Sequence, residues 1–271
     1  MANKLYNKIY KTIYSNFSQL KNKKLRFYEG FDFVTVLVDG MAIRFPKNNE
    51  SIKKLETEKL VLKNISPKIT FLIPDYQKNL DKSFEYYSEI VGGELTVAFY
   101  NNLSESKKNK LCKNLATFIS QLHSLKLSKN ISQKIPTENW ERLYKKIERE
   151  MKLYLPPQKS NQDFLVLFKK FVLQEKRMVL THGDLSGDNI IINKTKKELA
   201  GVIDFGDISF SDPIVDFSHF WSFGEKMVKR VVFFYTKDKK ERERILEYSK
   251  LHNLYIKILM KIIKEKNKKG V

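Results

Sequence analysis

The sequence predicts an α+β fold in two lobes, with a small antiparallel-sheet lobe first and a larger, mainly helical lobe after it. Apolar and polar residues alternate between residues 25 and 46, and Asp39-Gly40 interrupts them as a hairpin turn would. From Ser104 onward apolar residues recur every three or four positions, which is the period of an amphipathic helix. The lobes are expected at residues 1–91 and 92–271.

The elements of the first lobe can be assigned in order. Residues 5–20 predict a short amphipathic helix, and residues 25–46 predict two strands joined by the Asp39-Gly40 turn. Residues 50–65 have a helical pattern again. Residues 71–74 and 84–91 are strand-like, and Gly92-Gly93 follows the second of them directly. We interpret residues 88–91 as the hinge between the lobes.

The second lobe is mostly helical by the same criterion. Helices are predicted after Ser104 and at residues 140–155, 164–173, 217–235 and 242–264. Two short apolar runs, residues 190–192 and 201–203, are too short for confident helices and suit buried strands. The polar, Lys-containing segment between them is typical of a turn, so a hairpin is expected within the helical lobe.

Composition limits the classes of protein that this chain can be. With 271 residues and 42% hydrophobic residues, the chain can bury a sizeable core. Its single cysteine, Cys112, excludes an internal disulfide framework and a multi-cysteine zinc site, as is typical of a reducing cytoplasm. No apolar run has the length of a membrane span or a signal peptide. We therefore expect a cytoplasmic monomer without a membrane partner.

The net charge of +20 is the unusual feature of the composition. Strongly basic chains often bind nucleic acids. Here, however, the Lys residues are scattered along the whole chain and do not cluster with aromatic residues. We interpret the charge as a generally basic surface and expect no nucleic-acid partner.

Two acidic clusters lie at the ends of the predicted hairpin. H-G-D at residues 182–184 is followed by Asn189, and D-F-G at residues 204–206 comes twenty residues after Asp184. Phosphoryl transfer needs an acceptor oxygen in line with the γ-phosphate, and Mg²⁺ to neutralise the phosphate oxygens. Mg²⁺ accepts carboxylate and amide oxygens, so Asn189 and Asp204 are candidate metal ligands. Asp184 is then left to accept the proton of the acceptor hydroxyl. Turn-forming residues alone could explain one such cluster, but hardly two in this order and at this spacing.

The order H-x-D-x-x-x-x-N followed by D-F-G is that of the protein-kinase-like fold. The segments HGDLSGDNIII and GVIDFGDISFSDPIVDF resemble the aminoglycoside phosphotransferases, bacterial resistance kinases with this fold. Gly183 stands where protein kinases have Arg, and D-F-G-D followed by Ser211-Asp-Pro213 is most similar to the 2''-phosphotransferase branch. The resemblance implies transfer of the γ-phosphate of GTP or ATP to the 2''-hydroxyl of an aminoglycoside, conferring resistance. The first lobe would bind the nucleotide, and the second would carry catalysis and the acceptor.

The resemblance also implies a nucleotide site. Arg44 takes the place of the phosphate-binding lysine; it keeps the charge but presents a planar fork instead of a point charge. A bulky Tyr87 at the entrance of the purine pocket would favour GTP at least as much as ATP. The residues expected to bind the nucleotide are Gly30, Arg44, Lys47, Glu58, Ser186, Tyr87 at the pocket entrance, and the hinge residues Ser88, Glu89 and Ile90.

On the acceptor side, the resemblance implies carboxylates near the catalytic base. The candidates are Asp184 itself, Asp188, Asp207 and Glu225. The segment at residues 218–225 is dominated by aromatic residues, and Glu225 is its single acid, whereas a polycationic acceptor requires opposing charge. A kinase of another hydroxylated metabolite therefore remains an alternative. A catalytically lapsed nucleotide-binding pseudokinase is a second alternative, which the intact Asp184, Asn189 and Asp204 disfavour.

Overall fold

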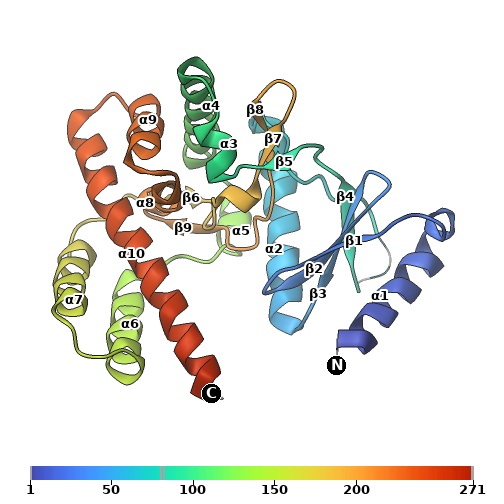
Figure 1. Cartoon of the computed structure of the whole chain (residues 1–271), viewed down its shortest axis with the longest axis horizontal. Coiled ribbons are helices and arrows are strands. Elements are labelled where there is room, and N and C mark those ends of the chain that lie inside the picture. Colours follow the sequence, from blue (N-terminus) through green and yellow to red (C-terminus); the bar gives the residue numbers. More distant parts are fainter. Residues whose placement is uncertain (1, 80, 82, 270–271) are drawn as a thin grey trace.

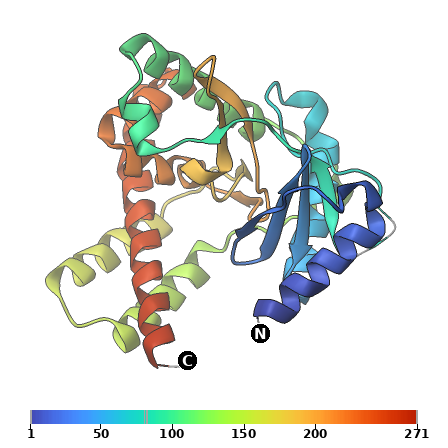
Figure 2. The same ribbon diagram turned by 45° about the vertical axis from the view of Figure 1, so that its right-hand side comes forward.

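The computed structural model describes residues 2–79, 81 and 83–269, and it has the two lobes that the sequence predicts (Figure 1). The N-terminal sheet is antiparallel and runs in the order β1 (Arg26–Glu29), β2 (Phe33–Val38), β3 (Met41–Pro46) and β4 (Glu85–Ser88). Helix α1 (Ala2–Asn16) covers one face of this sheet, and α2 (Asn49–Ile65) lies on the other side (Figures 1 and 2).

The alternation of β2 decides which face of the sheet meets α1. Val34, Val36 and Val38 are buried in one apolar cluster with Ile9 and Ile13 of α1. The intervening positions, beginning with Phe33, face the other way because successive side chains of a strand point to opposite faces. The β2–β3 turn is the predicted Asp39-Gly40 pair, at φ 50° and 77°. The positive angles are those of a primed hairpin turn, so this prediction is confirmed.

The C-terminal lobe contains two apolar cores. The first joins α4 (Glu105–His123), α9 (Glu225–Tyr235) and the last turns of α2. The second lies between α6 (Trp140–Tyr154), α7 (Lys159–Val172) and the long helix α10 (Lys239–Lys269), and it includes stacked phenylalanine rings of α7. Short helices α3 (Val97–Asn101), α5 (Lys129–Ser132) and α8 (Ile214–Phe217) connect these elements.

The predicted hairpin is present at the junction of the lobes. It consists of β7 (Ile190–Asn193) and β8 (Glu198–Val202), and β5 (Gly93–Glu94) pairs with β7 on its other side. A second small sheet pairs β6 (Val179–Thr181) with β9 (Ser209–Ser211). The segment from β6 to β7 contains H-G-D, and the segment from β8 to β9 contains D-F-G. The two motifs therefore lie side by side, and the Ile203 N–H donates to the Asn189 carbonyl at 2.9 Å.

The structure corrects several predicted elements. Residues 71–74 form no strand; Leu72 makes a single parallel bridge to Gly201, where a Cβ would lie 2.3 Å from the Leu72 carbonyl oxygen. The helix predicted at residues 217–235 is broken: a 3₁₀ segment (Ser218–Phe223) separates α8 from α9, and it ends at Gly224 with φ 96°. Helix α7 begins earlier than predicted, and α10 is longer at both ends. Of the helices in the described part of the chain, none combines the length and apolarity needed to cross a bilayer.

Candidate active site

The catalytic loop begins where β6 ends, and Gly183 allows its sharp turn. Gly183 has φ +90°, and a Cβ at this position would lie 2.2 Å from the carbonyl oxygen of Asp207. Both the positive φ and this close approach exclude a larger side chain. A glycine between His182 and Asp184 is therefore required by the contact of this loop with the D-F-G segment.

A buried carboxylate holds the backbone of the same loop. Asp216 of α8 accepts hydrogen bonds from the backbone N–H groups of His182 and Gly183, both at 3.0 Å, and its Oδ2 lies 2.9 Å from His123 Nε2. Burial alone would raise the pKa of Asp216, but the hydrogen bond and charge of His123 outweigh it and lower that pKa. The ionised Asp216 thus fixes the backbone that presents Asp184.

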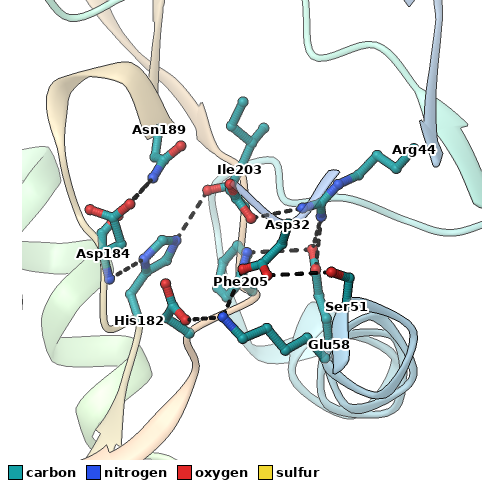
Figure 3. A network of polar contacts seen from close by, with 12 residues as sticks. Asp32, Arg44, Ser51, Glu58, His182, Asp184, Asn189, Ile203 and Phe205 are labelled. Atoms are coloured by element: carbon teal, nitrogen blue, oxygen red, sulfur yellow. Dashed lines mark hydrogen bonds and ion pairs between the residues drawn. The ribbon is translucent and has the colours of Figure 1, made fainter. Parts of the chain in front are cut away.

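The side chain of Asp184, the predicted base, is 40% accessible to solvent. Asn189 donates from Nδ2 to Asp184 Oδ2 at 3.1 Å and to the Asp184 carbonyl at 2.8 Å (Figure 3). His219, from the 3₁₀ segment after α8, places Nε2 3.2 Å from Asp184 Oδ1. Both oxygens of the carboxylate therefore have a partner, while the group remains open to the cleft.

The D-F-G segment is anchored by its phenylalanine. Phe205 is buried, and its ring lies 4.5 Å from that of His182. His182 Nε2 is 3.1 Å from the carbonyl oxygen of Ile203, so this histidine braces the segment (Figure 3). Asp204 has φ 63°, which is unusual for a residue other than glycine. This backbone conformation lets Phe205 point into the core while the Asp204 carboxylate stays 46% exposed.

Arg44 of β3 is the centre of a buried polar network (Figure 3). Its Nη1 lies 2.7 Å from both carboxylate oxygens of Glu58 in α2 and 2.8 Å from the hydroxyl of Tyr76, and its Nη2 donates to Asp204 Oδ1 at 2.8 Å. Its guanidinium also lies 4.1 Å from the ring centre of Phe33. Burial opposes the charge of Arg44, but Glu58, Tyr76 and Asp204 together raise its pKa. The planar fork contacts three partners at once, which one ammonium group could not do as well.

A second basic residue links the two lobes. Lys54 of α2 donates to Asp32 Oδ2 at 2.7 Å and to Asp207 Oδ1 at 2.9 Å. Asp32 belongs to the β1–β2 loop, and Asp207 follows D-F-G. These two carboxylates raise the pKa of Lys54 despite its partial burial, so the ammonium stays charged.

A cleft of about 1130 Å³ lies between the lobes, and most of the predicted site residues line it. On the N-terminal side the cleft is lined by the sheet face that carries Phe33 and by the β1–β2 loop. On the C-terminal side it is lined by the catalytic and D-F-G segments. Tyr87 is part of the wall: it is 4% exposed and packs edge-on against Tyr76 with 5.2 Å between ring centres. The predicted site residues that line the cleft are Gly30, Arg44, Tyr87, Glu89, Ile90, Asp184, Ser186, Asp188, Asn189, Asp204 and Asp207.

Four predicted site residues do not line the cleft. Lys47 turns to Glu29 at 3.0 Å and to the Gly30 carbonyl at 2.6 Å. Ser88 pairs with Met41 in the register of β3 and β4, one position along from the cleft-lining Tyr87. Glu58 is buried behind the cleft and contacts the cleft-lining Arg44. Glu225 is exposed on α9 and forms an ion pair with Lys229. In the hinge, the Glu89 N–H donates to the Gly40 carbonyl at 2.8 Å, so this backbone donor already has a partner within the N-terminal lobe.

The donor set at the floor of the cleft fits Mg²⁺. The Asn189 amide nitrogen is used by Asp184, which leaves its carbonyl oxygen as the free end of the side chain. Asp204 Oδ1 contacts Arg44, and Oδ2 adds a second hard oxygen on the neighbouring segment. Within the described residues there is no group of three or more His, Cys, Asp or Glu suited to a metal. Two protein oxygens supplemented by phosphates and waters are what Mg²⁺ usually takes in kinases.

Three contacts in this site were not predicted from the sequence. Tyr76 lies in an irregular segment without periodicity, and nothing in its surroundings indicates a partner for Arg44. His219 falls within the aromatic-rich stretch at residues 218–225, where neither spacing nor a neighbouring motif indicates a contact with Asp184. Lys54 is one lysine among many on α2. In each case the contact depends on the packing of segments far apart in the chain.

The comparison with protein families decides the assignment. The model of the phosphotransferase enzyme family, APH, matches residues 45–247, which is most of the chain. The chain belongs to this family. This phosphotransferase is therefore an enzyme that acts on hydroxyl groups of small molecules, as the geometry of Asp184, Asn189 and Asp204 already suggested.

Solved structures have the same fold over nearly the full length of this phosphotransferase. The GDP and kanamycin complex of APH(2")-IIia has a TM-score of 0.79 at 25% identity, covering 92% of this chain and 89% of that one. The streptomycin–ATP complex of APH(2")-IIa has a TM-score of 0.75 at 23% identity, with 93% and 89% covered. A type I macrolide 2'-phosphotransferase has a TM-score of 0.68 at 17% identity, with 92% and 89% covered. The two-lobed kinase-like fold and the similarity to the 2'' branch are thus confirmed.

Proposed function

We propose that this phosphotransferase transfers the γ-phosphate of GTP or ATP to the 2''-hydroxyl of an aminoglycoside and thereby confers resistance. The observation that supports an aminoglycoside is the charge of the cleft. Eight carboxylates line it, against three basic side chains, although the whole chain carries a net charge of +20. A cleft of one sign concentrates ligands of the opposite sign, and an aminoglycoside is a polycation.

The cleft side chains divide into two groups by their place. Arg44 and Asp204, which form an ion pair, are assigned to the nucleotide phosphates together with Asn189 of the catalytic loop. Asp188 and Asp207 are exposed carboxylates that line the same cleft as Asp184, and they are suited to ammonium groups of the acceptor. Mg²⁺, when bound at Asn189 and Asp204, would neutralise charge on the β- and γ-phosphate oxygens. The positions of these residues in the cleft support the proposed roles.

Asp184 would act directly on the acceptor. Its carboxylate is accessible from the cleft; Oδ2 accepts a hydrogen bond from Asn189, and Oδ1 lies 3.2 Å from His219 Nε2. It would accept the hydroxyl proton as the acceptor oxygen bonds to the γ-phosphorus and the bond from that phosphorus to the leaving nucleoside diphosphate breaks. A base placed in this way contributes about 10²–10⁴-fold to the rate.

A second acceptor class has an observation in its favour. Glu225, the single acid of the segment at residues 218–225, is paired with Lys229 and does not line the cleft. The segment at residues 218–225 therefore supplies no carboxylate to the cleft for the ammonium groups of a large polycation. A less cationic hydroxylated compound would need fewer of them, and a macrolide 2'-phosphotransferase has the same fold.

The test is a transfer assay with purified protein, MgGTP or MgATP, and a panel containing kanamycin, gentamicin, streptomycin and a macrolide. We expect one phosphate to be added to an aminoglycoside, with the 2''-position identified by NMR of the product, and no product with Asp184→Asn. Expression of the gene in a susceptible bacterium should raise the inhibitory concentration of the same compound. Transfer to the macrolide alone would favour the second acceptor class, and transfer to none would reject both.

A further inference from the structure

His219 contacts the carboxylate of Asp184, the predicted base. His219 Nε2 lies 3.2 Å from Asp184 Oδ1, while Asn189 Nδ2 lies 3.1 Å from Oδ2. The two partners come from different segments, one from the 3₁₀ turn before β7 and one from the 3₁₀ segment after α8. The terminal torsion of an Asp side chain is soft and roughly two-fold. One partner on each oxygen is the arrangement that fixes such a torsion.

The backbone that carries His219 is held firmly. Ser218 donates from Oγ to the Ile214 carbonyl at 2.9 Å, and its own carbonyl accepts from Asn253 Nδ2 of α10 at 2.8 Å. The His219 carbonyl accepts from Ser222 Oγ at 2.7 Å. The imidazole itself is 22% exposed. His219 is therefore placed by α8 and α10 and is not a free surface side chain.

The protonation states decide which tautomer of His219 suits this contact. Burial lowers the pKa of His219, and the negative charge of Asp184 only partly opposes this effect. A neutral imidazole carries one N–H, and an ionised carboxylate can only accept. With Nε2 3.2 Å from Oδ1, the tautomer protonated at Nε2 is the one that avoids repulsion between a ring lone pair and the carboxylate.

We propose that His219 is a positioning residue for phosphoryl transfer, which holds the Asp184 carboxylate in the rotamer that faces the acceptor hydroxyl. This inference rests on the proposed function, because it assigns a role within the same reaction. Asn189 alone would leave the carboxylate free to rotate away from the acceptor. Small misplacements of a catalytic group cost large factors in rate because the reacting geometry is narrow.

The kinetic test compares His219→Leu with His219→Gln, whose side-chain amide can still donate near the position of Nε2. For His219→Leu we expect kcat to fall about tenfold to a hundredfold while the KM for the nucleotide stays within about twofold. His219→Gln should retain most of the parent kcat. If kcat of His219→Leu equals that of the parent, or if both variants lose the same kcat at equal urea stability, the positioning role is wrong.

A second measurement needs no acceptor and separates this inference from the proposed function. In protein labelled with ¹⁵N-histidine, the pKa of His219 is followed by NMR, and His219→Gln identifies its resonance among the four histidines. The groups that face it are Asp184, Asp188, Asp216, His182 and His252. Asp184→Asn should lower the pKa of His219, because the imidazolium loses its anionic partner. If Asp184→Asn leaves the pKa of His219 unchanged, the contact and the positioning role are wrong. If the pKa of His219 falls as expected but the transfer assay gives no product, the proposed function is rejected instead.

Discussion

Replacement of Arg44 by Met leaves the Glu58 carboxylate buried without its cationic partner. Glu58 is 0% exposed, and both of its oxygens lie 2.7 Å from Arg44 Nη1. The hydroxyl of Tyr76, 3.0 Å away, remains as a neutral donor, and the Phe205 N–H is distant at 3.4 Å. Removing one partner of a buried ion pair costs about 3–5 kcal/mol, because the other charge stays desolvated. We expect Arg44→Met to lose about this much free energy of unfolding.

The loss of stability should depend on pH. Burial already raises the pKa of Glu58, even though Arg44 acts to lower it. Without Arg44 the pKa of Glu58 rises further. A carboxyl group whose pKa is higher in the folded than in the unfolded state stabilises the fold at low pH, and this contribution is lost as the pH rises through the folded-state pKa. The stability difference between the parent and Arg44→Met should therefore grow as the pH rises above the ordinary pKa range of glutamate.

The assay is urea unfolding followed by circular dichroism at several pH values. With an m-value of about 3 kcal/mol/M, the expected loss moves the midpoint by about 1–1.7 M. The matched control is the double variant Arg44→Met with Glu58→Gln, which removes the uncompensated charge. This variant should recover part of the stability and lose the pH dependence. A change below about 1 kcal/mol in Arg44→Met, or a loss that does not vary with pH, would refute the reasoning.

Four further predictions concern catalysis and binding. Asp184→Asn should lower kcat by about 10²–10⁴-fold while fluorescent-nucleotide titration shows unchanged affinity; turnover near that of the parent would exclude Asp184 as the base. Asp204→Ala should weaken binding of the magnesium nucleotide, and a Mg²⁺ titration equal to that of the parent would contradict the metal assignment. Tyr87→Ala should improve kcat/KM for ATP relative to GTP, which an unchanged ratio would disprove. Lys54→Met should lower the KM of a cationic acceptor about twofold to fivefold by freeing Asp207, with an uncharged acceptor unaffected; equal changes for both acceptors would count against this.

The local elements and the chemistry of the two motifs could be predicted from the amino-acid sequence. Strand alternation, the Asp39-Gly40 turn and the hairpin of β7 and β8 depend on patterns within a few residues, so they can be recognised before the fold is known. The order and spacing of H-G-D, Asn189 and D-F-G likewise indicated phosphoryl transfer. Where local patterns were short or mixed, as at residues 71–74 and 217–235, the prediction failed. Tertiary packing decided those segments: Leu72 lies against Gly201, and a 3₁₀ segment and Gly224 separate α8 from α9.

The assembly of the site depends on contacts between segments far apart in the chain, which the sequence does not predict. Arg44 meets Asp204 across 160 positions of sequence, and His219 meets Asp184 through the packing of α8 against α10. Folding also brings eight carboxylates together in one cleft, although the chain as a whole is strongly basic. The composition alone does not indicate this acidic cleft. A side chain carries its charge and shape wherever it stands in the sequence. Its partners are set by the docking of distant segments, and no pattern of period two or 3.6 records that docking.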